Sequence, residues 1–156
     1  MEITDRDTIT GDKLPEQMVE FIGEHHLLTL ATSSAEDIWC SHAFYVYLED
    51  ESAFLIISEE KTRHVKLARV NPVVSGGIAL ETKRVGEIRG LQFKAVMEQC
   101  ESSIFEKYKL AYLKSFPYAI FKGGDLWLLR ITEAKFTDNR LGRSEEHTSE
   151  LQSHSF

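Results

Sequence analysis

A short basic segment carries the residue types best suited to hold a phosphate group. Residues 58–72 read SEEKTRHVKLARVNP, and Lys61, Thr62, Arg63 and His64 cluster where a predicted strand gives way to a predicted helix. Arginine offers a fork of N–H donors that matches a phosphate, and the free N–H groups and dipole of a helix start favour an anion. The segment therefore indicates a phosphate site. An ordinary solvated basic turn is the other interpretation of the same residues.

Other kinds of reactive site find little support in the residue pattern. No Ser/His/Asp set or carboxylate pair stands out as a nucleophile or general base. The two cysteines, Cys40 and Cys100, are too few for a disulfide framework, and no Cys/His pair has the spacing of zinc ligands. We therefore assign no catalytic residue and no metal site from the sequence.

The elements that must position the basic segment follow from the period of the apolar residues. Alternation with aromatic and β-branched residues predicts strands, and recurrence at helical spacing predicts helices. Ser58 is predicted to cap a helix that runs to about Val70, where Asn71-Pro72 stops it. The predicted strands are 26–34, 38–48, 53–58, 73–80, 86–100 and 126–136, and the predicted helices are 14–26, 58–70 and 103–115.

The arrangement of these elements predicts a mainly β fold. Residues 38–58 are expected to form an antiparallel hairpin, and Gly76-Gly77 to mark a bulge or a close approach between strands. Strands and helices do not alternate as in a doubly wound sheet. A closed or partly closed six-stranded antiparallel barrel with peripheral helices fits better.

Composition places the chain among soluble single-domain proteins. It has 156 residues, 42% of them hydrophobic, and a formal net charge of -7. The acidity argues against general nucleic-acid binding and against adsorption to anionic membranes. No apolar run reaches the ~18 residues of a membrane helix, and the polar N-terminus does not read as a signal peptide. We expect a reduced, cytoplasmic protein.

Three segments are expected along the chain: a flexible N-terminus over 1–13, the barrel domain over 14–142 and a tail over 143–156. The tail is polar, with only Leu151 and Phe156 as large apolar residues. Its first twelve residues, RSEEHTSELQSH, look like the in-frame translation of a sequencing-library adapter. We therefore expect the tail to be artefactual or disordered, and a natural C-terminus to be missing after about Gly142.

Several motifs, spread over residues 38–142, resemble those of a known group of proteins. The chain resembles the YhbP-like (UPF0306) family of the pyridoxamine 5'-phosphate oxidase-like FMN-binding split-barrel superfamily. The motifs that carry the resemblance are IWC at 38–40, AFY at 43–45, EEKTRH at 59–64, IRGLQFK at 88–94, KFTDN at 135–139 and LG at 141–142.

The resemblance implies a six-stranded split-barrel homodimer with FMN at the interface. In the superfamily, a serine or threonine at a strand end and a basic triplet after it bind the FMN phosphate. Those positions fall on Ser58 and on Thr62, Arg63 and His64, with Lys61 beside them. The strand that carries His42 and Tyr45 would line the flavin ring.

The chain also departs from the superfamily pattern. His64 stands where the family often has lysine, and His42 stands near a flavin-contacting arginine of the true oxidases. From its strand face alone, His42 is either a hydrogen-bonded core residue or a residue at the flavin edge. The arginine-rich substrate-phosphate signature has no counterpart before residue 143, so oxidation of pyridoxamine phosphate itself is not expected.

Three functional hypotheses follow. The first is an FMN-dependent oxidoreductase that acts on a small-molecule substrate which the sequence does not name. The second is a non-catalytic flavin- or haem-binding protein on the same barrel. The third is a barrel without a cofactor that serves as an interaction module. The sequence leaves open whether the protein is an enzyme.

Overall fold

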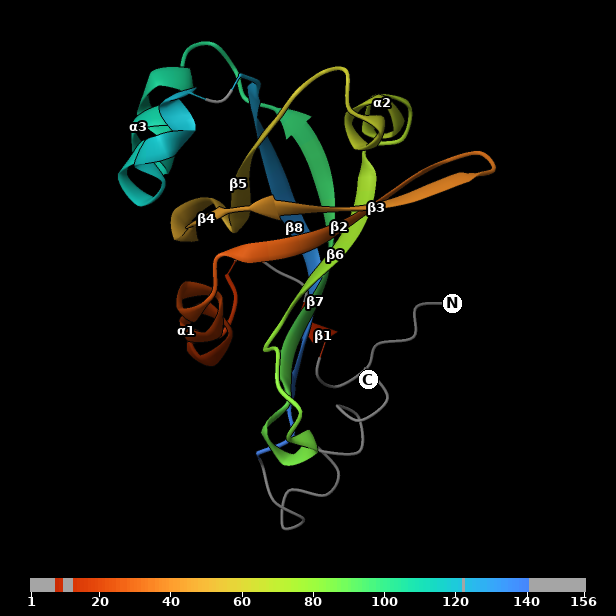
Figure 1. Cartoon of the computed structure of the whole chain (residues 1–156), viewed down its shortest axis with the longest axis vertical. Helices are drawn as coiled ribbons and strands as arrows, with labels where there is room; N and C mark the ends of the chain where they lie inside the picture. Colours follow the sequence, from red (N-terminus) through yellow and green to blue (C-terminus); the bar gives the residue numbers. More distant parts are fainter. Residues whose placement is uncertain (1–7, 10–12, 122, 141–156) are drawn as a thin grey trace.

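Antiparallel strands form the body of the molecule. The computed structural model describes residues 8–9, 13–121 and 123–140, which form one curved sheet with three α-helices at its margins (Figure 1). The strands are β1 (Thr8–Ile9), β2 (Leu27–Ser34), β3 (Asp37–Phe44), β4 (Val46–Leu48), β5 (Ala53–Ser58), β6 (Val73–Ala79), β7 (Arg89–Gln99) and β8 (Asp125–Asp138). The helices are α1 (Glu16–Glu24), α2 (Arg63–Val70) and α3 (Phe105–Ser115), with short 3-10 turns η1 (Glu49–Glu51), η2 (Val85–Glu87) and η3 (Pro117–Phe121).

The strand order is β3-β2-β6-β7-β8-β5-β4, with β1 paired to β8. This antiparallel half-barrel confirms the mainly β class. The predicted count of six strands is wrong, because seven strands form the main path and the two-residue β1 adds to them. Residues of β1 fall within the 1–13 stretch expected to be flexible, whereas the tail over 143–156 lies outside the described residues.

The additional strand arises at Tyr45, which interrupts the predicted strand 38–48. β3 pairs with β2 as far as Phe44, and β4 pairs with β5 from Val46 onward. Between them, the Tyr45 N–H donates to the His26 carbonyl at 3.0 Å, and the Tyr45 hydroxyl donates to the Ile22 carbonyl at 2.6 Å. The predicted hairpin over 38–58 is therefore wrong for its first half, and only β4 and β5 form it.

This interruption joins the two edges of the sheet. β3 and β4 stand at opposite ends of the strand order, yet a single residue separates them in the chain. The backbone, rather than a ladder of hydrogen bonds, connects the two edges at this point.

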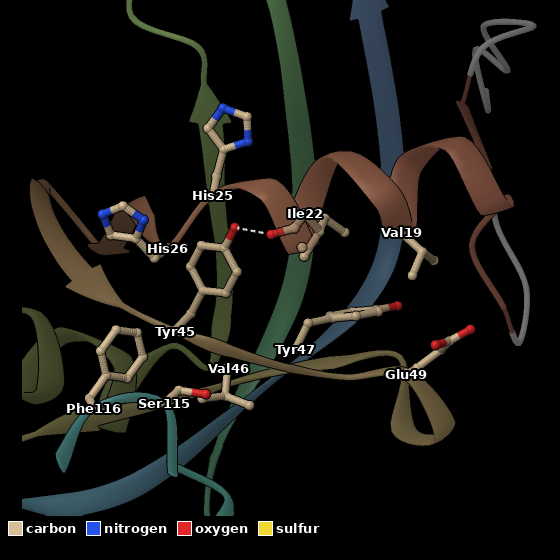
Figure 2. Close-up of a pocket in the computed structure, with 11 residues that line it drawn as sticks. Val19, Ile22, His25, His26, Tyr45, Val46, Tyr47, Glu49, Ser115 and Phe116 are labelled. Carbon is tan, nitrogen blue, oxygen red and sulfur yellow. Dashed lines mark hydrogen bonds between the residues drawn. The ribbon is translucent and has the colours of Figure 1, made fainter. Parts of the chain in front are cut away.

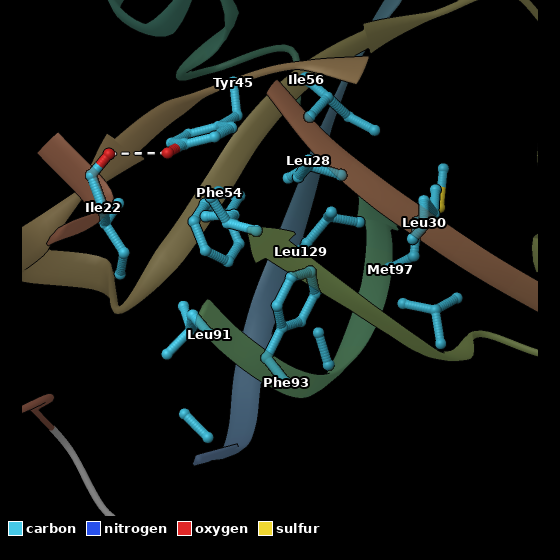
Figure 3. Close-up of a cluster of buried hydrophobic side chains, with 14 of the residues drawn as sticks. Ile22, Leu28, Leu30, Tyr45, Phe54, Ile56, Leu91, Phe93, Met97 and Leu129 are labelled. Carbon is cyan, nitrogen blue, oxygen red and sulfur yellow. Dashed lines mark hydrogen bonds between the residues drawn. The ribbon is translucent and has the colours of Figure 1, made fainter. Parts of the chain in front are cut away.

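A buried cluster fills the inner side of the curved sheet. Leu28 and Leu30 from β2, Leu91 and Phe93 from β7, and Phe54 from β5 are each at most 3% exposed (Figure 3). The rings of Phe54 and Phe93 lie 4.8 Å apart between centroids, at a tilt of 43°. This centre of aromatic and branched side chains supplies the main hydrophobic stabilisation of the barrel.

The glycine pair on β6 marks a close approach. A Cβ placed on Gly76 would lie 2.4 Å from the Thr29 carbonyl oxygen and 2.5 Å from the ring of Phe93. The register shift lies elsewhere, where Thr132 of β8 is the extra residue opposite Lys94 and Ala95 of β7. Of the two predicted readings of the glycines, the close approach is the one observed.

A second, smaller cluster lies outside the barrel under α3. Tyr108 and Tyr112 of α3 cover Leu55 of β5 and Leu126 and Leu128 of β8. Helix α3 therefore covers the outer side of β5 and of the first half of β8. None of the helices in the described part of the chain is both long and apolar enough to cross a membrane.

Candidate functional site

The basic segment forms a turn between β5 and α2. Ser58 is the last residue of β5 and is 5% exposed, and α2 begins at Arg63 with Thr62 as its N-cap. The predicted helix start at Ser58 is wrong, because Thr62 closes a turn first. Its N–H and its hydroxyl both donate to the Glu59 carbonyl, at 3.1 Å and 2.7 Å.

Three of the predicted phosphate ligands meet at this turn. His64 Nε2 lies 2.8 Å from Ser58 Oγ and 3.4 Å from Thr62 Oγ1. Two hydroxyls and an imidazole thus converge at the strand end, immediately before the first turn of α2. Ser58 and His64 can donate hydrogen bonds to an anion at the helix start, whereas the Thr62 hydroxyl already donates its proton to Glu59.

Arg63 extends from the same turn towards β3. Its guanidinium donates two hydrogen bonds to the Asp37 carboxylate, one of them from Nε at 3.3 Å. The guanidinium carbon lies 4.1 Å from the centroid of the Trp39 ring. The Trp39 ring therefore provides a flat surface that positions the Arg63 guanidinium. The Asp37 carboxylate accepts the hydrogen bonds that Arg63 could otherwise donate to a phosphate.

The acidic residues of the turn have cations of their own. Lys61 Nζ lies 3.2 Å from Glu59, and Arg69 pairs with Glu60. The Lys61 side chain is 83% exposed, so it extends into solvent beside Ser58, Thr62 and His64, which we call the Ser58 group. These pairs reduce the negative field that the two glutamates place near the helix start.

His42 and Tyr45 lie apart from the Ser58 group. His42 is exposed on the outer face of β3, with Nδ1 3.2 Å from the Thr29 hydroxyl. Its interpretation as a core residue is wrong. Tyr45 is 4% exposed and faces the barrel interior, where burial raises the pKa of its hydroxyl. The structure brings together Ser58, Thr62, Arg63 and His64 of the predicted set.

Two buried hydroxyls beneath α2 lack a protein partner. Thr32 Oγ1 and Ser41 Oγ are buried, and neither has a hydrogen-bond partner among the described protein groups. Thr32 is paired in register with Trp39, and Ser41 shares the face of β3 that carries Trp39. Buried polar groups are usually hydrogen-bonded. Ser41 is paired in register with Leu30, so both hydroxyls lie on the face of β2 and β3 that is turned towards the core.

Sequence reasoning did not identify Asp37 or Trp39 as part of the site. Both lie on β3, outside the basic segment, and the packing of this strand against α2 brings them to Arg63. The available signal was the alternation of the strand, which placed Trp39 on the face opposite to His42.

A cavity of about 630 Å³ lies between α1, β4 and the chain that follows α3 (Figure 2). Tyr45 and Tyr47 contribute to its lining, and so do Glu49, His26 and Phe116. Phe44, on the outer face of β3, contacts the rings of His26 and Phe116 at centroid distances of 5.9 Å and 5.4 Å. The cavity therefore adjoins the strand that carries His42.

A shallow groove of about 590 Å³ crosses the outer face of β2, β6 and β7; we call it the outer groove. Small side chains line much of it, among them Thr29, Ala31, Ser75, Gly77 and Ala79. Large apolar side chains on the same strands and on β3 stay exposed: Leu27, Ile38, Phe44 and Val73, at 47%, 74%, 48% and 49%.

Solved structures with a similar fold include cofactor-binding proteins. HutZ, the haem storage protein from Vibrio cholerae, matches with a TM-score of 0.66 at 22% identity, over 81% of this chain and 96% of HutZ. An FAD-binding protein from Mesorhizobium loti matches with a TM-score of 0.62 at 12% identity, over 84% of this chain and 99% of that protein. These similarities establish the pyridoxamine 5'-phosphate oxidase-like split-barrel fold.

Sequence relatives are closer. No family model matches the chain. The UPF0306 protein plu4501 from Photorhabdus laumondii is 37% identical over 122 residues, which cover 78% of this chain and 85% of the relative. The UPF0306 protein YhbP from Escherichia coli is 35% identical over 122 residues, which cover 78% and 83%. The chain therefore belongs to the UPF0306 family, which includes YhbP.

Proposed function

We propose that the protein binds FMN through the Ser58 turn and acts as a flavin-dependent oxidoreductase on a small molecule. The observation that carries this proposal is the convergence of Ser58, Thr62 and His64 at the start of α2, beside the guanidinium of Arg63. Hydroxyls, an imidazole, an arginine fork and a helix start together form a donor set suited to a phosphate monoester.

Arg63 would exchange one anion for another when the phosphate binds. Its pair with Asp37 is about half exposed on both sides, and pairs of this kind contribute only ~0.2–1 kcal/mol. A dianionic phosphate held also by Ser58, and by Thr62 if its hydroxyl exchanges the Glu59 carbonyl for the phosphate, offers more, because charge-assisted hydrogen bonds contribute ~1.5–3 kcal/mol each. Bound FMN would supply the redox chemistry, while these residues hold and orient it.

We also propose that the protein is a homodimer formed through the outer groove. A row of small side chains permits close approach of a second sheet, and the exposed Ile38, Leu27 and Phe44 around it would become buried. His42 lies on this same face, so the interface would bring it near a cofactor shared between two protomers.

A second candidate function is cofactor binding without catalysis, with haem or a flavin as the cofactor. The similarity of fold to HutZ supports this alternative, because HutZ is a haem storage protein. We assign no general base or nucleophile among the described residues. No group of three or more His, Cys, Asp or Glu side chains among them is placed to hold a metal ion.

Titration of the full chain with FMN, riboflavin and haemin distinguishes these functions. We expect FMN to bind at least about tenfold more tightly than riboflavin, which lacks the phosphate. Arg63→Ala should reduce FMN affinity towards that of riboflavin, whereas Lys66→Ala, which removes an exposed cation from the same helix, should have little effect. Fluorescence quenching measures flavin binding, and the Soret band measures haem binding.

Equal affinities for FMN and riboflavin, or equal effects of the two substitutions, would contradict the phosphate site. A Soret shift with haemin and no flavin binding would instead support the haem-binding alternative. If FMN binds, oxidation of NAD(P)H by the loaded protein supports the oxidoreductase, and its absence supports a flavin carrier or store.

A further inference from the structure

The cavity beside α1 has a distinctive chemical lining. Glu49 lies at one end, and His26 and Phe116 lie towards the other, with the rings of Tyr45 and Tyr47 between them (Figure 2). Helix α1 contributes apolar groups, so the space is bounded by aromatic and aliphatic surfaces. At about 630 Å³, it is large enough for a small organic molecule.

Among the described residues, the ionisable groups that line the cavity are one carboxylate, two imidazoles and two phenols. Glu49 is the one carboxylate among the described lining residues, and none of them is lysine or arginine. Glu51, nearby in η1, is paired with Arg130 at 2.9 Å, whereas Glu49 faces the cavity. A phosphate ester would meet a carboxylate here and no permanent cation.

The negative charge of Glu49 acts on the Tyr47 hydroxyl, which also lines the cavity. Burial is the largest cause of the raised pKa of the Tyr47 hydroxyl, and the charge of Glu49 raises it further. The phenol that lines the cavity thus stays protonated at neutral pH and lies in a negative potential.

Two other polar groups of the cavity, Tyr45 and His25, are suited to accept hydrogen bonds. The Tyr45 hydroxyl donates its proton to Ile22, which leaves the phenolic oxygen as an acceptor. His25 Nδ1 lies 2.8 Å from the Phe21 carbonyl, so a neutral imidazole carries its proton there and has Nε2 as an acceptor. The lining therefore suits a ligand that brings its own hydrogen-bond donors.

We propose that this cavity binds a small aromatic cation, with its positive group near Glu49 and its ring between Tyr45, Tyr47 and Phe116. The faces of these aromatic rings attract a cation as well as a ring, and the carboxylate adds a charge-assisted hydrogen bond. The site does not depend on which cofactor, if any, the protein holds. Binding of an aromatic cation at this site can be measured on the cofactor-free chain.

Three ligands that share one phenyl ring test the proposal: 2-phenylethylamine, 2-phenylethanol and 3-phenylpropionate. Saturation-transfer NMR and calorimetry on the full chain should show the amine binding most tightly, about tenfold better than the carboxylate. Glu49→Gln should reduce the affinity for the amine about fivefold or more and leave the alcohol unchanged. Asp50→Asn is the matched control, because it removes an adjacent exposed carboxylate that does not line the cavity.

Equal affinities for the amine and the carboxylate would overturn the proposal, and so would equal effects of Glu49→Gln and Asp50→Asn. Tyr47→Leu supplies an independent test, since it should weaken both the amine and the alcohol by removing part of the aromatic wall. Unchanged binding in that variant would place the ligand elsewhere. Because FMN is absent from this titration, failure of the aromatic-cation site leaves the phosphate-site experiment unaffected.

Discussion

Tyr45 combines three structural roles in one side chain. Its ring packs against Phe54 at 5.0 Å in the core, its hydroxyl bonds to the α1 carbonyl of Ile22, and its backbone marks the change of partner between β3 and β4. It also lines the cavity proposed to bind an aromatic cation. Substitution of this residue is therefore expected to affect stability as well as binding.

Tyr45→Phe keeps the ring and removes only the hydroxyl. Loss of the hydrogen bond to Ile22 should lower the free energy of unfolding at neutral pH by about 1 kcal/mol. Burial raises the pKa of Tyr45 above its ordinary value of about 10, so the unfolded chain loses this proton first as the pH rises. Stability present below about pH 10 is then lost with increasing pH, and the variant should lose less of it.

Urea unfolding from about pH 9 to about pH 11 measures this difference. Tyr118→Phe is the control, because Tyr118 is 86% exposed and its loss should change neither quantity. An alkaline profile of Tyr45→Phe that parallels the wild type would contradict a buried, protonated Tyr45. Tyr47, Tyr108 and Tyr112 also have pKa values raised by burial, so part of the dependence should persist in the variant.

At the scale of elements, the close contact of β2, β6 and β7 depends on Gly76. A methyl group there would meet a backbone oxygen of β2 and the Phe93 ring of β7 at once, and a backbone atom cannot move aside as a side-chain end can. Gly76→Ala should therefore lower the free energy of unfolding by roughly 1–3 kcal/mol.

Gly86→Ala is the matched control, because nothing lies within 4 Å of a Cβ at that position. Thermal and urea unfolding of both variants give the comparison. Equal stability of Gly76→Ala and Gly86→Ala would mean that the three strands are packed more loosely than described.

Most elements could be predicted from apolar period, and their partners could not. The apolar pattern located β2, β5, β6, β7 and β8 to within a few residues, because each contributes apolar side chains to the core, β2 from one face and β5 from both. It also extended β3 through Tyr45, since inward and outward parity continues across the corner. Only the hydrogen bonds from Tyr45 to His26 and Ile22 interrupt the ladder, and those partners are distant in sequence.

The candidate site shows the same division. The basic segment could be found because five donor side chains lie within seven residues, 58–64, at a strand-to-helix junction. Asp37 and Trp39 could not be assigned to it, since their approach to Arg63 depends on the placement of β3 beneath α2. Lys61, adjacent in sequence, points to its own partner Glu59. Proximity along the chain therefore indicated the site without distinguishing its members.

At the scale of the whole molecule, the outer groove is the surface where assembly is expected. Ala31→Arg places a long cation in the middle of the row of small side chains, where a second sheet would leave it buried without a counter-charge. We expect the dimer of the wild-type chain to dissociate to monomers in this variant, with a weakened FMN affinity if the cofactor is shared. Analytical ultracentrifugation measures the change.

Leu110→Arg is the control for this variant, since it replaces a 68% exposed apolar residue on α3, away from the groove. It should leave the dimer intact. A wild-type monomer, or a dimer that Ala31→Arg leaves unchanged and Leu110→Arg disrupts, would exclude the outer groove as the interface.

Tyr45, the single residue between β3 and β4, connects three elements of the fold: the two edge strands and helix α1. Tyr45 holds β3 and β4 together through the backbone and holds α1 through its hydroxyl. Outward displacement of α1 would break the hydrogen bond from Tyr45 to Ile22 and would separate the junction of β3 and β4 from the helix. A molecule bound in the cavity proposed for an aromatic cation would contact both α1 and Tyr45, and would therefore add to the contacts that hold the helix against the junction of β3 and β4.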